Sequence, residues 1–499
     1  MKVVTCQQMR EAEEAAFAKG VSASELMDDA GLGIAKALQK FFPRPGQAVL
    51  YLGKGNNAGD ALVAAAHLLR AGWQISVRLR HDPSQFKELP AEHWRKLQGQ
   101  VTVLAEATEV MALDGPLVLV DALVGIGVTG ALRSELAALA REMNAVRAAR
   151  HAPLVAIDIP SGLNSDSGEP LDPCVEADYT LTIAHPKTPL LADAATRVVG
   201  RLEIIPLHGL QHVVGDVNAE VLTPRGLAYR LPMRPFDFHK GQAGRVGVIA
   251  GSRGFIGAAD LCSRGVLHGG AGLVTLYVKE DAYPLLAVRT TAEVMVKCVS
   301  DYREVLRDPL DALAIGPGIS TQPAAEILDL MSRAKCPLVI DADALNILAL
   351  HGIEGLRSIF VPCLLTPHPG EFARLVKHEP EWKTLSRRAS AEEFVRRFPN
   401  TSLLLKGSRT VISGRGKPVA FNTTGHPGMA SGGMGDVLTG VCAALIGQGL
   451  CPYEAGCLGA WVDGRAAELA LTYSGYSAES LSAMAVLDHL GRAFSELGN

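Results

Sequence analysis

The chain has 499 residues, a hydrophobic fraction of 48% and a formal net charge of −4 at pH 7. The length fits two or three α/β domains, and the composition is ordinary for globular domains with buried cores. Because the balance of charge is slightly acidic, we expect neither nucleic acid nor an anionic membrane surface as a partner. No uninterrupted apolar run approaches the roughly 18 residues that a membrane span requires.

The nine cysteines are scattered along the chain and form no C-x-x-C pair. This spacing is typical of reduced thiols, so we expect a cytoplasmic protein. The first 20 residues lack the apolar centre of a signal peptide and instead predict an amphipathic helix.

The first half of the chain predicts helices over residues 7–19 and 22–42, with Ser24 as a possible N-cap of the second. Apolar strands then alternate with helical segments, which is the pattern of a parallel, doubly wound α/β sheet. The expected strands are residues 47–52, 74–79, 116–121, 153–158 and 178–184.

This alternation weakens after residue 184, and residues 212–238 contain three prolines and little periodicity. We therefore place a domain junction near residues 216–222, so that the expected domains are residues 1–216 and 217–499. A second α/β series follows, with a long apolar helix over residues 435–447. Its expected strands are residues 245–250, 272–278, 312–316, 337–341, 363–367, 402–406 and 410–414.

Three of the expected strands in the first half end in glycine-rich or polar loops. The loops are GKGNNAGDA (residues 53–61), DALVGIGVTG (residues 121–130) and DIPSG (residues 158–162). Ligands bind outside the carboxyl ends of parallel strands, and the free N–H groups of a helix start attract anions. The three loops together therefore predict one binding site, although each alone is also compatible with a structural turn or a helix cap.

These three segments resemble the N-terminal domain of the NAD(P)H-hydrate epimerase family. The usual family form of the first loop is N-N-G-G-D-G, from which Ala58 and Ala61 each depart by one methyl group. The resemblance implies a Rossmann-like fold and a site for a hydrated dinucleotide. The residues implied to bind it are Asn56, Asn57, Ala58, Gly59, Asp60, Gly125, Ile126, Gly127, Val128, Thr129, Gly130 and Ala131.

The resemblance also implies a potassium ion held by Asn57, Asp121 and Ser161, whose hard oxygen donors suit such a cation. Asp158 is implied to contact the substrate near C6, the carbinolamine carbon that bears the added hydroxyl. Epimerisation requires a proton to be removed and returned around that centre, which a well-placed carboxylate can do. We therefore expect Asp158 to be catalytic.

The strongest motif of the second half is NTTGHPGMASGGMGDVLTG, residues 422–440. Gly432, Gly433 and Gly435 crowd the start of an apolar helix, where unpaired N–H groups and the positive end of the helix dipole suit a phosphate. Asp436 lies in the first turn, where its carboxylate could take a proton from a hydroxyl that attacks this phosphate. The structural alternative is a helix with an acidic first turn.

This helix start resembles the ribokinase-like superfamily, and further segments narrow the family. They are HKGQAGRVGVIAGSRGFIGAADL (residues 239–261), GPG (316–318), DADALN (341–346), LLTPHPGEFARL (364–375) and LLKGSRTVI (404–412), in this order. Together they resemble the ADP- or ATP-dependent NAD(P)H-hydrate dehydratases over nearly all of the second half. A mild departure is Phe255, where tyrosine is common. The resemblance implies a ribokinase-like α/β domain.

Carried over residue by residue, the resemblance implies two sets of contacts in the second half. ADP, accompanied by Mg²⁺, is implied to bind Lys406, Gly407, Ser408, Arg409, Thr410 and Gly435, and the hydrate to bind Ala258, Gly318, His368 and Asp436. Simpler interpretations remain open: Lys406 as a solvated strand-end lysine and His368 as a rigid loop residue. Asp341, Asp343 and Asn346 are compatible with a magnesium site, but we favour helix capping for them.

The implied reaction is phosphorylation followed by elimination. Asp436 takes the proton from the C6 hydroxyl of the S hydrate, and the oxygen attacks the terminal phosphoryl group of ADP. Loss of phosphate then restores NADH or NADPH and leaves AMP. The epimerase would convert the R hydrate into the form that the dehydratase accepts, and relatives that assemble lead us to expect a homo-oligomer.

Two alternatives stand beside this interpretation. A ribokinase-like vitamin or sugar kinase would share the G-G-x-G-D helix start and carry an accessory dinucleotide-binding domain. Alternatively, the first half is a binding module without catalysis. The kinase interpretation explains neither the attached first domain nor the ordered HPGE and KGSRT segments, and R-to-S interconversion by the isolated residues 1–216 would decide on the binding module.

Overall fold

The computed structural model describes residues 1–210 and 215–498, and these divide into two compact units, Met1–Val217 and Asn218–Asn499. Each unit contains a sheet covered by helices, so the α/β class predicted for both halves is confirmed. No helix in the described ranges combines the length and apolar character that a membrane crossing needs.

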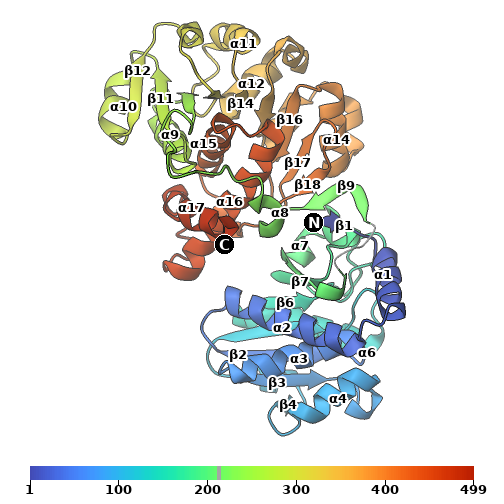
Figure 1. Cartoon of the computed structure of the whole chain (residues 1–499). Coiled ribbons are helices and arrows are strands. Elements are labelled where there is room, and N and C mark those ends of the chain that lie inside the picture. Colours follow the sequence, from blue (N-terminus) through green and yellow to red (C-terminus); the bar gives the residue numbers. More distant parts are fainter. Residues whose placement is uncertain (211–214, 499) are drawn as a thin grey trace. The chain divides into compact units, whose positions relative to one another are not determined.

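The first unit begins with two helices and continues as alternating strands and helices (Figure 1). Its strands are β1 (Lys2–Val3), β2 (Gln47–Leu52), β3 (Gln74–Leu79), β4 (Thr102–Leu104), β5 (Leu117–Ala122), β6 (Leu154–Ile157), β7 (Tyr179–Ile183) and β8 (Arg201–Ile205). Its α-helices are α1 (Cys6–Ala18), α2 (Ala23–Phe41), α3 (Asn56–Arg70), α4 (Glu88–Leu97), α5 (Ala107–Met111), α6 (Ser134–Arg150) and α7 (Thr196–Val199).

The main sheet of the first unit has the strand order β4-β3-β2-β5-β6-β7-β8, and all of these neighbours are parallel. Along β2, Leu50 faces a core that includes Ile34 of α2 and Leu62 of α3, whereas Tyr51 faces a second core with Met143 of α6. Helices therefore cover both faces. The strand order reverses between β2 and β5, which is where doubly wound sheets bind ligands.

The second unit repeats this plan at larger size (Figure 1). Its strands are β9 (Asp216–Val221), β10 (Arg245–Ile249), β11 (Leu273–Val278), β12 (Val294–Cys298), β13 (Ala312–Ile315), β14 (Leu338–Ile340), β15 (Cys363–Leu365), β16 (Thr401–Leu405), β17 (Val411–Gly414) and β18 (Val419–Phe421). Its α-helices are α8 (Pro224–Ala228), α9 (Ile256–His268), α10 (Tyr283–Arg289), α11 (Ala324–Arg333), α12 (Ala342–His351), α13 (Pro369–Leu375), α14 (Arg387–Arg397), α15 (Met434–Gly447), α16 (Pro452–Tyr473) and α17 (Ala483–Gly498).

The sheet of the second unit runs in the order β9-β18-β17-β16-β15-β14-β13-β10-β11-β12. It is parallel from β16 to β12, whereas β16, β17 and β18 form antiparallel pairs. The strand order reverses between β10 and β13. The segments that follow these two strands are therefore expected to line a ligand site in the second unit as well.

Most of the predicted strands occur within one residue of the observed bounds, and β2 and β3 have the predicted bounds. The predicted cap of the second helix was wrong, because Ser22 rather than Ser24 accepts the hydrogen bond from the backbone N–H of Glu25. The prediction of an irregular stretch over residues 212–238 was also partly wrong. Residues 212–214 lie outside the described residues, but strand β9 and helix α8 occupy much of the remainder.

Helix α15 packs closely against α9 in the second unit (Figure 1). A Cβ atom on Gly265 of α9 would lie 2.5 Å from the carbonyl oxygen of Val437, and one on Gly440 of α15 would collide with the carbonyl oxygen of Cys262. The two backbones can approach this closely because both positions lack a side chain. This contact sets the position of the start of α15, where the predicted phosphate-binding motif lies.

We expect Gly440→Ala to destabilise the second unit by about 1–3 kcal/mol, because the added methyl group overpacks the contact between α9 and α15. The measurement is the midpoint of denaturant-induced unfolding. The matched control is Gly491→Ala in α17, where a new Cβ meets open space. Since alanine is the better helix former by about 1 kcal/mol, the control is expected to be neutral or stabilising. Equal shifts for the two variants would contradict the proposed close contact.

Candidate active sites

The first site contains a buried polar cluster at the point where the strand order reverses. Asp121, near the end of β5, accepts hydrogen bonds from the backbone N–H and the hydroxyl of Ser161, both at 2.7 Å, and from the N–H of Leu123 at 3.1 Å. The Asn57 amide donates to the carbonyl oxygens of Val124 and Ile157 at 3.0 and 3.2 Å. Three segments far apart in the sequence are thereby held together.

The donor set of this cluster is compatible with an alkali cation. It offers the amide oxygen of Asn57, the carboxylate of Asp121, the hydroxyl of Ser161 and nearby backbone carbonyls, which are all hard oxygen ligands. In the described residues, no group of three or more His, Cys, Asp or Glu side chains is arranged to hold a metal ion. Burial raises the pKa of Asp121 to about 6, although the bonds from Ser161 oppose this rise.

Asp158 follows β6 in a left-handed backbone conformation, with φ of 67°, and is mostly buried. Its Oδ1 accepts a bond from the ammonium of Lys187 at 2.5 Å and one from the N–H of Ile183 at 3.3 Å. Lys187 is only 1% exposed and also donates to the Thr182 hydroxyl and the Ile183 carbonyl oxygen. Sequence reasoning did not identify Lys187. A signal was available, because this lysine follows an expected strand within an otherwise apolar and proline-rich segment.

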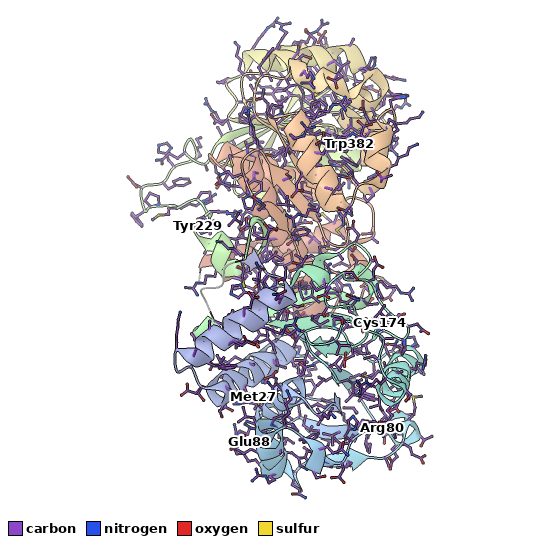
Figure 2. The ribbon with its side chains drawn as sticks, turned by 90° about the vertical axis from the view of Figure 1, so that its right-hand side faces the viewer. Met27, Arg80, Glu88, Cys174, Tyr229 and Trp382 are labelled. Carbon is purple, nitrogen blue, oxygen red and sulfur yellow. The ribbon has the colours of Figure 1, made fainter. Side chains whose placement is uncertain are left out.

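A second carboxyl group, Asp60, lies buried in α3 close enough to Asp158 for their charges to interact. Burial, followed by the negative charges of Asp158 and of Glu13 on α1, raises the pKa of Asp60 well above its usual range. Gly59 beside it makes room for α2, since a Cβ there would lie 2.5 Å from the sulfur of Met27 (Figure 2). The helix α1, which sequence reasoning did not connect with the site, therefore also contributes to its electrostatics.

The loop between β5 and α6 contains residues 125–131, which the resemblance assigns to the hydrate. Arg10 of α1 approaches the carbonyl oxygen of Ile126 at 3.5 Å, and Asn164 donates to the carbonyl oxygen of Thr129 at 2.7 Å. A Cβ on Gly125 would lie 3.6 Å from Oδ2 of Asp158, so this loop faces the second oxygen of that carboxylate. Gly127 and Gly130 border open space.

The second site is built around the start of α15. Gly433 precedes the helix with φ of +90°, which a residue with a side chain rarely adopts, and the first helical turn contains Asp436. Burial, followed by the negative charge of Asp341, raises the pKa of Asp436 to about 7, while Lys406 opposes this rise. The carboxyl group of Asp436 is therefore balanced between its two protonation states near neutral pH.

Lys406, at the end of β16, points its ammonium into this acidic cluster. The ammonium lies 3.0 Å from Oδ1 of Asp341 and 3.9 Å from Oε2 of Glu371, and a Cβ on Gly435 would be 3.1 Å away from it. Burial disfavours the ammonium, but Asp341 and Glu371 outweigh this effect and raise the pKa of Lys406. The alternative of a solvated strand-end lysine is therefore excluded.

Asp341 occupies the N-cap position of α12, but the favoured interpretation that its side chain caps the helix was wrong. Its side chain makes no capping bond, and its two oxygens instead bind the ammonium of Lys406 and the hydroxyl of Thr439 at 2.7 Å. Asp343, two residues after Asp341, accepts one hydrogen bond from the backbone N–H of Ser320 and one from the side-chain amide of Asn346. Asp341 therefore connects β14, β16 and α15.

The segment assigned to ADP forms the turn between β16 and β17. Ser408 is exposed, Arg409 is buried, and the Thr410 hydroxyl donates to the carbonyl oxygen of Gly407 at 3.3 Å. Arg387 of α14, which sequence reasoning missed, donates to the carbonyl oxygens of Leu405, Lys406 and Arg409. These bonds determine the shape of the turn and the direction of the Lys406 side chain.

The residues assigned to the hydrate border the same strand ends. His368 caps α13 by accepting bonds from the N–H groups of Gly370 and Glu371, and it remains half exposed. Helix α13 is anchored by Phe372, which packs edge-on against Trp382 with ring centroids 5.7 Å apart; Trp382 is labelled in Figure 2.

At the strand reversal of the second sheet, a Cβ on Gly318 would lie 3.1 Å from that of Ala258. These two residues assigned to the hydrate are therefore neighbours. They lie on the segments that follow β13 and β10, where a parallel sheet binds its ligand.

Comparison with known families assigns both halves of the chain. The family described as YjeF-related protein N-terminus matches residues 23–189, and the family described as NAD(P)H-hydrate dehydratase matches residues 246–488. The ADP/ATP-dependent NAD(P)H-hydrate dehydratase from Bacillus subtilis, crystallised with ATP and Mg²⁺, is 28% identical. It aligns over 55% of this chain and 97% of its own, with a TM-score of 0.47.

Full-length relatives contain both halves in the same order. The bifunctional NAD(P)H-hydrate repair enzyme of Moorella thermoacetica is 37% identical over 96% of this chain and 94% of that protein. The corresponding enzyme of Escherichia coli is 32% identical over 91% and 87%. A vitamin or sugar kinase with an accessory domain does not account for similarity across both halves. The chain therefore belongs to the family of bifunctional NAD(P)H-hydrate repair enzymes, which combine epimerisation of the hydrate with its nucleotide-dependent dehydration.

Proposed function

We propose that the two activities reside in separate domains, residues 1–216 and 217–499. The first interconverts the R and S hydrates of NADH and NADPH, and the second dehydrates the S form. The observation that carries the proposal is Asp436, a proton acceptor with a pKa near 7 placed at the glycine-rich start of α15 beside a buried ammonium.

In the first domain, the loops that contain residues 56–60 and 125–131 bind the hydrate, and Asp158 acts on the substrate near C6. The Lys187 ammonium donates to Oδ1 of Asp158 and holds its side chain in place. The Asn57, Asp121 and Ser161 oxygens would hold a potassium ion, whose charge would add to the hydrogen bonds that already join these loops at the strand ends. Support for this arrangement comes from the convergence of the three loops at the reversal of strand order.

In the second domain, Asp436 takes the proton from the C6 hydroxyl of the S hydrate. The freed oxygen attacks the terminal phosphoryl group of the nucleotide, while the N–H groups at the start of α15 stabilise the charge that develops on it. Phosphate is a better leaving group than hydroxide. Loss of the C5 proton together with cleavage of the C6–O bond therefore gives the double bond of NAD(P)H and inorganic phosphate.

The nucleotide is ADP, bound by residues 406–410 and Gly435, so that AMP is the second product. The hydrate lies against Ala258, Gly318, His368 and Asp436. Since Mg²⁺ prefers to keep water and substrate phosphates as ligands, it arrives with the nucleotide and needs few carboxylates from the protein. Parallel assays with ADP and with ATP distinguish the two nucleotides.

The protein acts on small molecules in the cytoplasm, as a homo-oligomer. The nine cysteines are all free thiols, and most of them are buried, as expected in a reducing compartment. Size-exclusion chromatography with light scattering measures the oligomeric state.

We expect Asp436→Asn to lower kcat for dehydration by about 10²–10⁴-fold, which is the usual contribution of a general base. Epimerisation is expected to be unaffected. Dehydration is followed by the return of absorbance at 340 nm from the hydrate, and epimerisation by chromatographic separation of the R and S forms. The reciprocal control is Asp158→Asn, which should lose epimerisation and still dehydrate pure S hydrate. A fully active Asp436→Asn dehydratase would refute the assignment.

The kcat/KM of dehydration is expected to rise with pH and level off above about 7, because Asp436 must be ionised to accept a proton. Lys406→Met removes a positive charge that lowers the pKa of Asp436, so the midpoint should move to higher pH. Asp341→Asn removes a negative charge that raises this pKa, so the midpoint should move to lower pH. Midpoints that stay in place, or that move together, would show that Asp436 is not the titrating group.

Replacing K⁺ by tetramethylammonium is expected to lower epimerase activity and the melting temperature of the first domain, since a cation that binds only the folded state stabilises it by an amount that grows with the logarithm of its concentration relative to Kd. Asp121→Asn should abolish this K⁺ response. The matched control is Asp178→Asn, which breaks an ion pair with Arg147 at the start of β7, away from the predicted cation ligands. The control should be less stable but keep the response. An Asp121→Asn protein that still responds to K⁺ would exclude this site.

A further inference from the structure

The first site contains two carboxyl groups in opposite surroundings. Asp158 is paired through Oδ1 with the ammonium of Lys187 at 2.5 Å and accepts a further bond from the N–H of Ile183. These two contacts hold Oδ1 and orient the Asp158 side chain, so that its second oxygen, Oδ2, is the one presented to a substrate.

Asp60 has no such partner. It is buried, and among the described residues no hydrogen bond or ion pair connects its carboxyl group to another group. The charges that act on it most strongly are negative, those of Asp158 and Glu13, while the opposing effect of Lys187, which pairs with Asp158, is smaller. Burial and these negative charges raise the pKa of Asp60, which favours its protonated form. A carboxyl group paired with an ammonium beside a buried one without a partner is an arrangement in which the roles of base and acid are divided.

The other charged and titratable groups near this pair come mainly from α1. Glu13 is less buried than Asp60, Arg10 contacts the carbonyl oxygen of Ile126, and the thiol of Cys6 has its pKa raised to about 12 by burial and by Asp158. Asp166 acts on Cys6 from further along the chain. None of these groups forms a hydrogen bond with Asp60.

The free oxygen of Asp158 points toward the substrate loops. Oδ1 is occupied by Lys187, whereas Oδ2 lies 3.6 Å from the position of a Cβ on Gly125, beside Asn57. The missing side chain of Gly125 leaves room in front of Oδ2. A ring placed there lies between the loop that contains Gly125 and the start of α3, which contains Asp60.

We propose that the epimerase opens and recloses the hydrated ring, with Asp158 as base and the buried carboxyl group of Asp60 as acid, and with Lys187 as the residue that positions Asp158. This inference rests on the proposed function of the first domain and assigns its chemistry. The carbinolamine at C6 is the nitrogen analogue of a hemiacetal, so acid–base ring opening is its simplest route to inversion.

The step balances in bonds and protons. Asp158 takes the proton of the C6 hydroxyl, and the electrons of that O–H bond form a C6=O double bond. The bond between C6 and the ring nitrogen breaks, and the nitrogen takes the proton of Asp60. Rotation about C5–C6 presents the other face of the aldehyde. The nitrogen then attacks C6, its proton returns to Asp60, and Asp158 gives its proton back to the oxygen. Both carboxyl groups end the cycle as they began it.

Isotopes distinguish this route from its rivals in the wild-type protein, without any substitution. The hydrate is labelled with ¹⁸O at C6, and epimerisation is followed by mass spectrometry in unlabelled water and in D₂O, with spontaneous exchange measured without enzyme. Ring opening predicts that ¹⁸O is retained and that C6 gains no deuterium. Loss of ¹⁸O in step with epimerisation would indicate C6–O cleavage, and deuterium at C6 would indicate removal of the C6 proton; either result overturns the proposal.

Variants test the assignment of the acid. Asp60→Asn is expected to lower kcat for epimerisation by about 10²–10⁴-fold with KM changed less than about threefold, because the amide keeps the shape but has no acidic proton. Lys187→Met should also lower kcat more than KM. The matched control Glu13→Gln removes a nearby carboxyl group and should stay within about threefold of wild type. Loss of activity in Glu13→Gln with Asp60→Asn unaffected would overturn the assignment.

Failure of this inference is distinguishable from failure of the proposed function. A wild-type protein that interconverts R and S hydrates with loss of ¹⁸O contradicts only the ring-opening route. A wild-type protein that does not interconvert them contradicts the function of the first domain itself. Thermal unfolding of each variant, with and without K⁺, verifies that the first domain is folded.

Discussion

Each site contains a buried lysine ammonium paired with a carboxylate. The surrounding segments are arranged so that this buried charge has its bonding partners. Removing one partner of a buried ion pair leaves a charge uncompensated and costs several kcal/mol. Lys187 is therefore tied to Asp158 and to two groups at the end of β7, and Lys406 to Asp341, which in turn binds Thr439 of α15. Because these bonds join segments that follow different strands, the positions of the reactive groups are determined by the sheet and not by flexible loops.

Both sheets open space for a ligand by the same topological rule. The reversal of strand order between β2 and β5, and between β10 and β13, separates the segments that leave neighbouring strands and opens space at their carboxyl ends. In the second domain the close contact of Gly265 and Gly440 lets α15 lie deep enough for Thr439, in its second turn, to reach Asp341. Glycine therefore meets two separate requirements at α15. Gly440 allows the backbone of α9 to approach closely, and Gly433 allows the positive φ that precedes the helix.

The strands and the three loops of the first site could be predicted from the sequence because they depend on local pattern. The apolar run 47–52 followed by glycine defines β2, and polar residues at strand ends must meet at one edge of a parallel sheet. Side-chain direction could not be predicted in this way. Lys406 lies in the segment assigned to nucleotide, yet its ammonium faces Asp341, and Lys187 joins Asp158 only because β6 and β7 are neighbours. Short strands such as β4, β12 and β18 are half exposed or only three residues long, so their pattern is weak.

The two sites handle a proton acceptor in different ways, and the difference follows from the energetics of their reactions. In the proposed epimerisation, which is reversible and has no co-substrate, Asp158 and Asp60 exchange protons with the substrate and return to their starting states. In the proposed dehydration, Asp436 must be free of its proton when the hydrate and the nucleotide are bound. A pKa near the working pH then combines a useful fraction of the charged form with the strongest available base. The surrounding charges differ accordingly. Lys187 pairs directly with Asp158, the proposed base of the epimerase. Lys406 pairs with Asp341 and only lowers the pKa of Asp436.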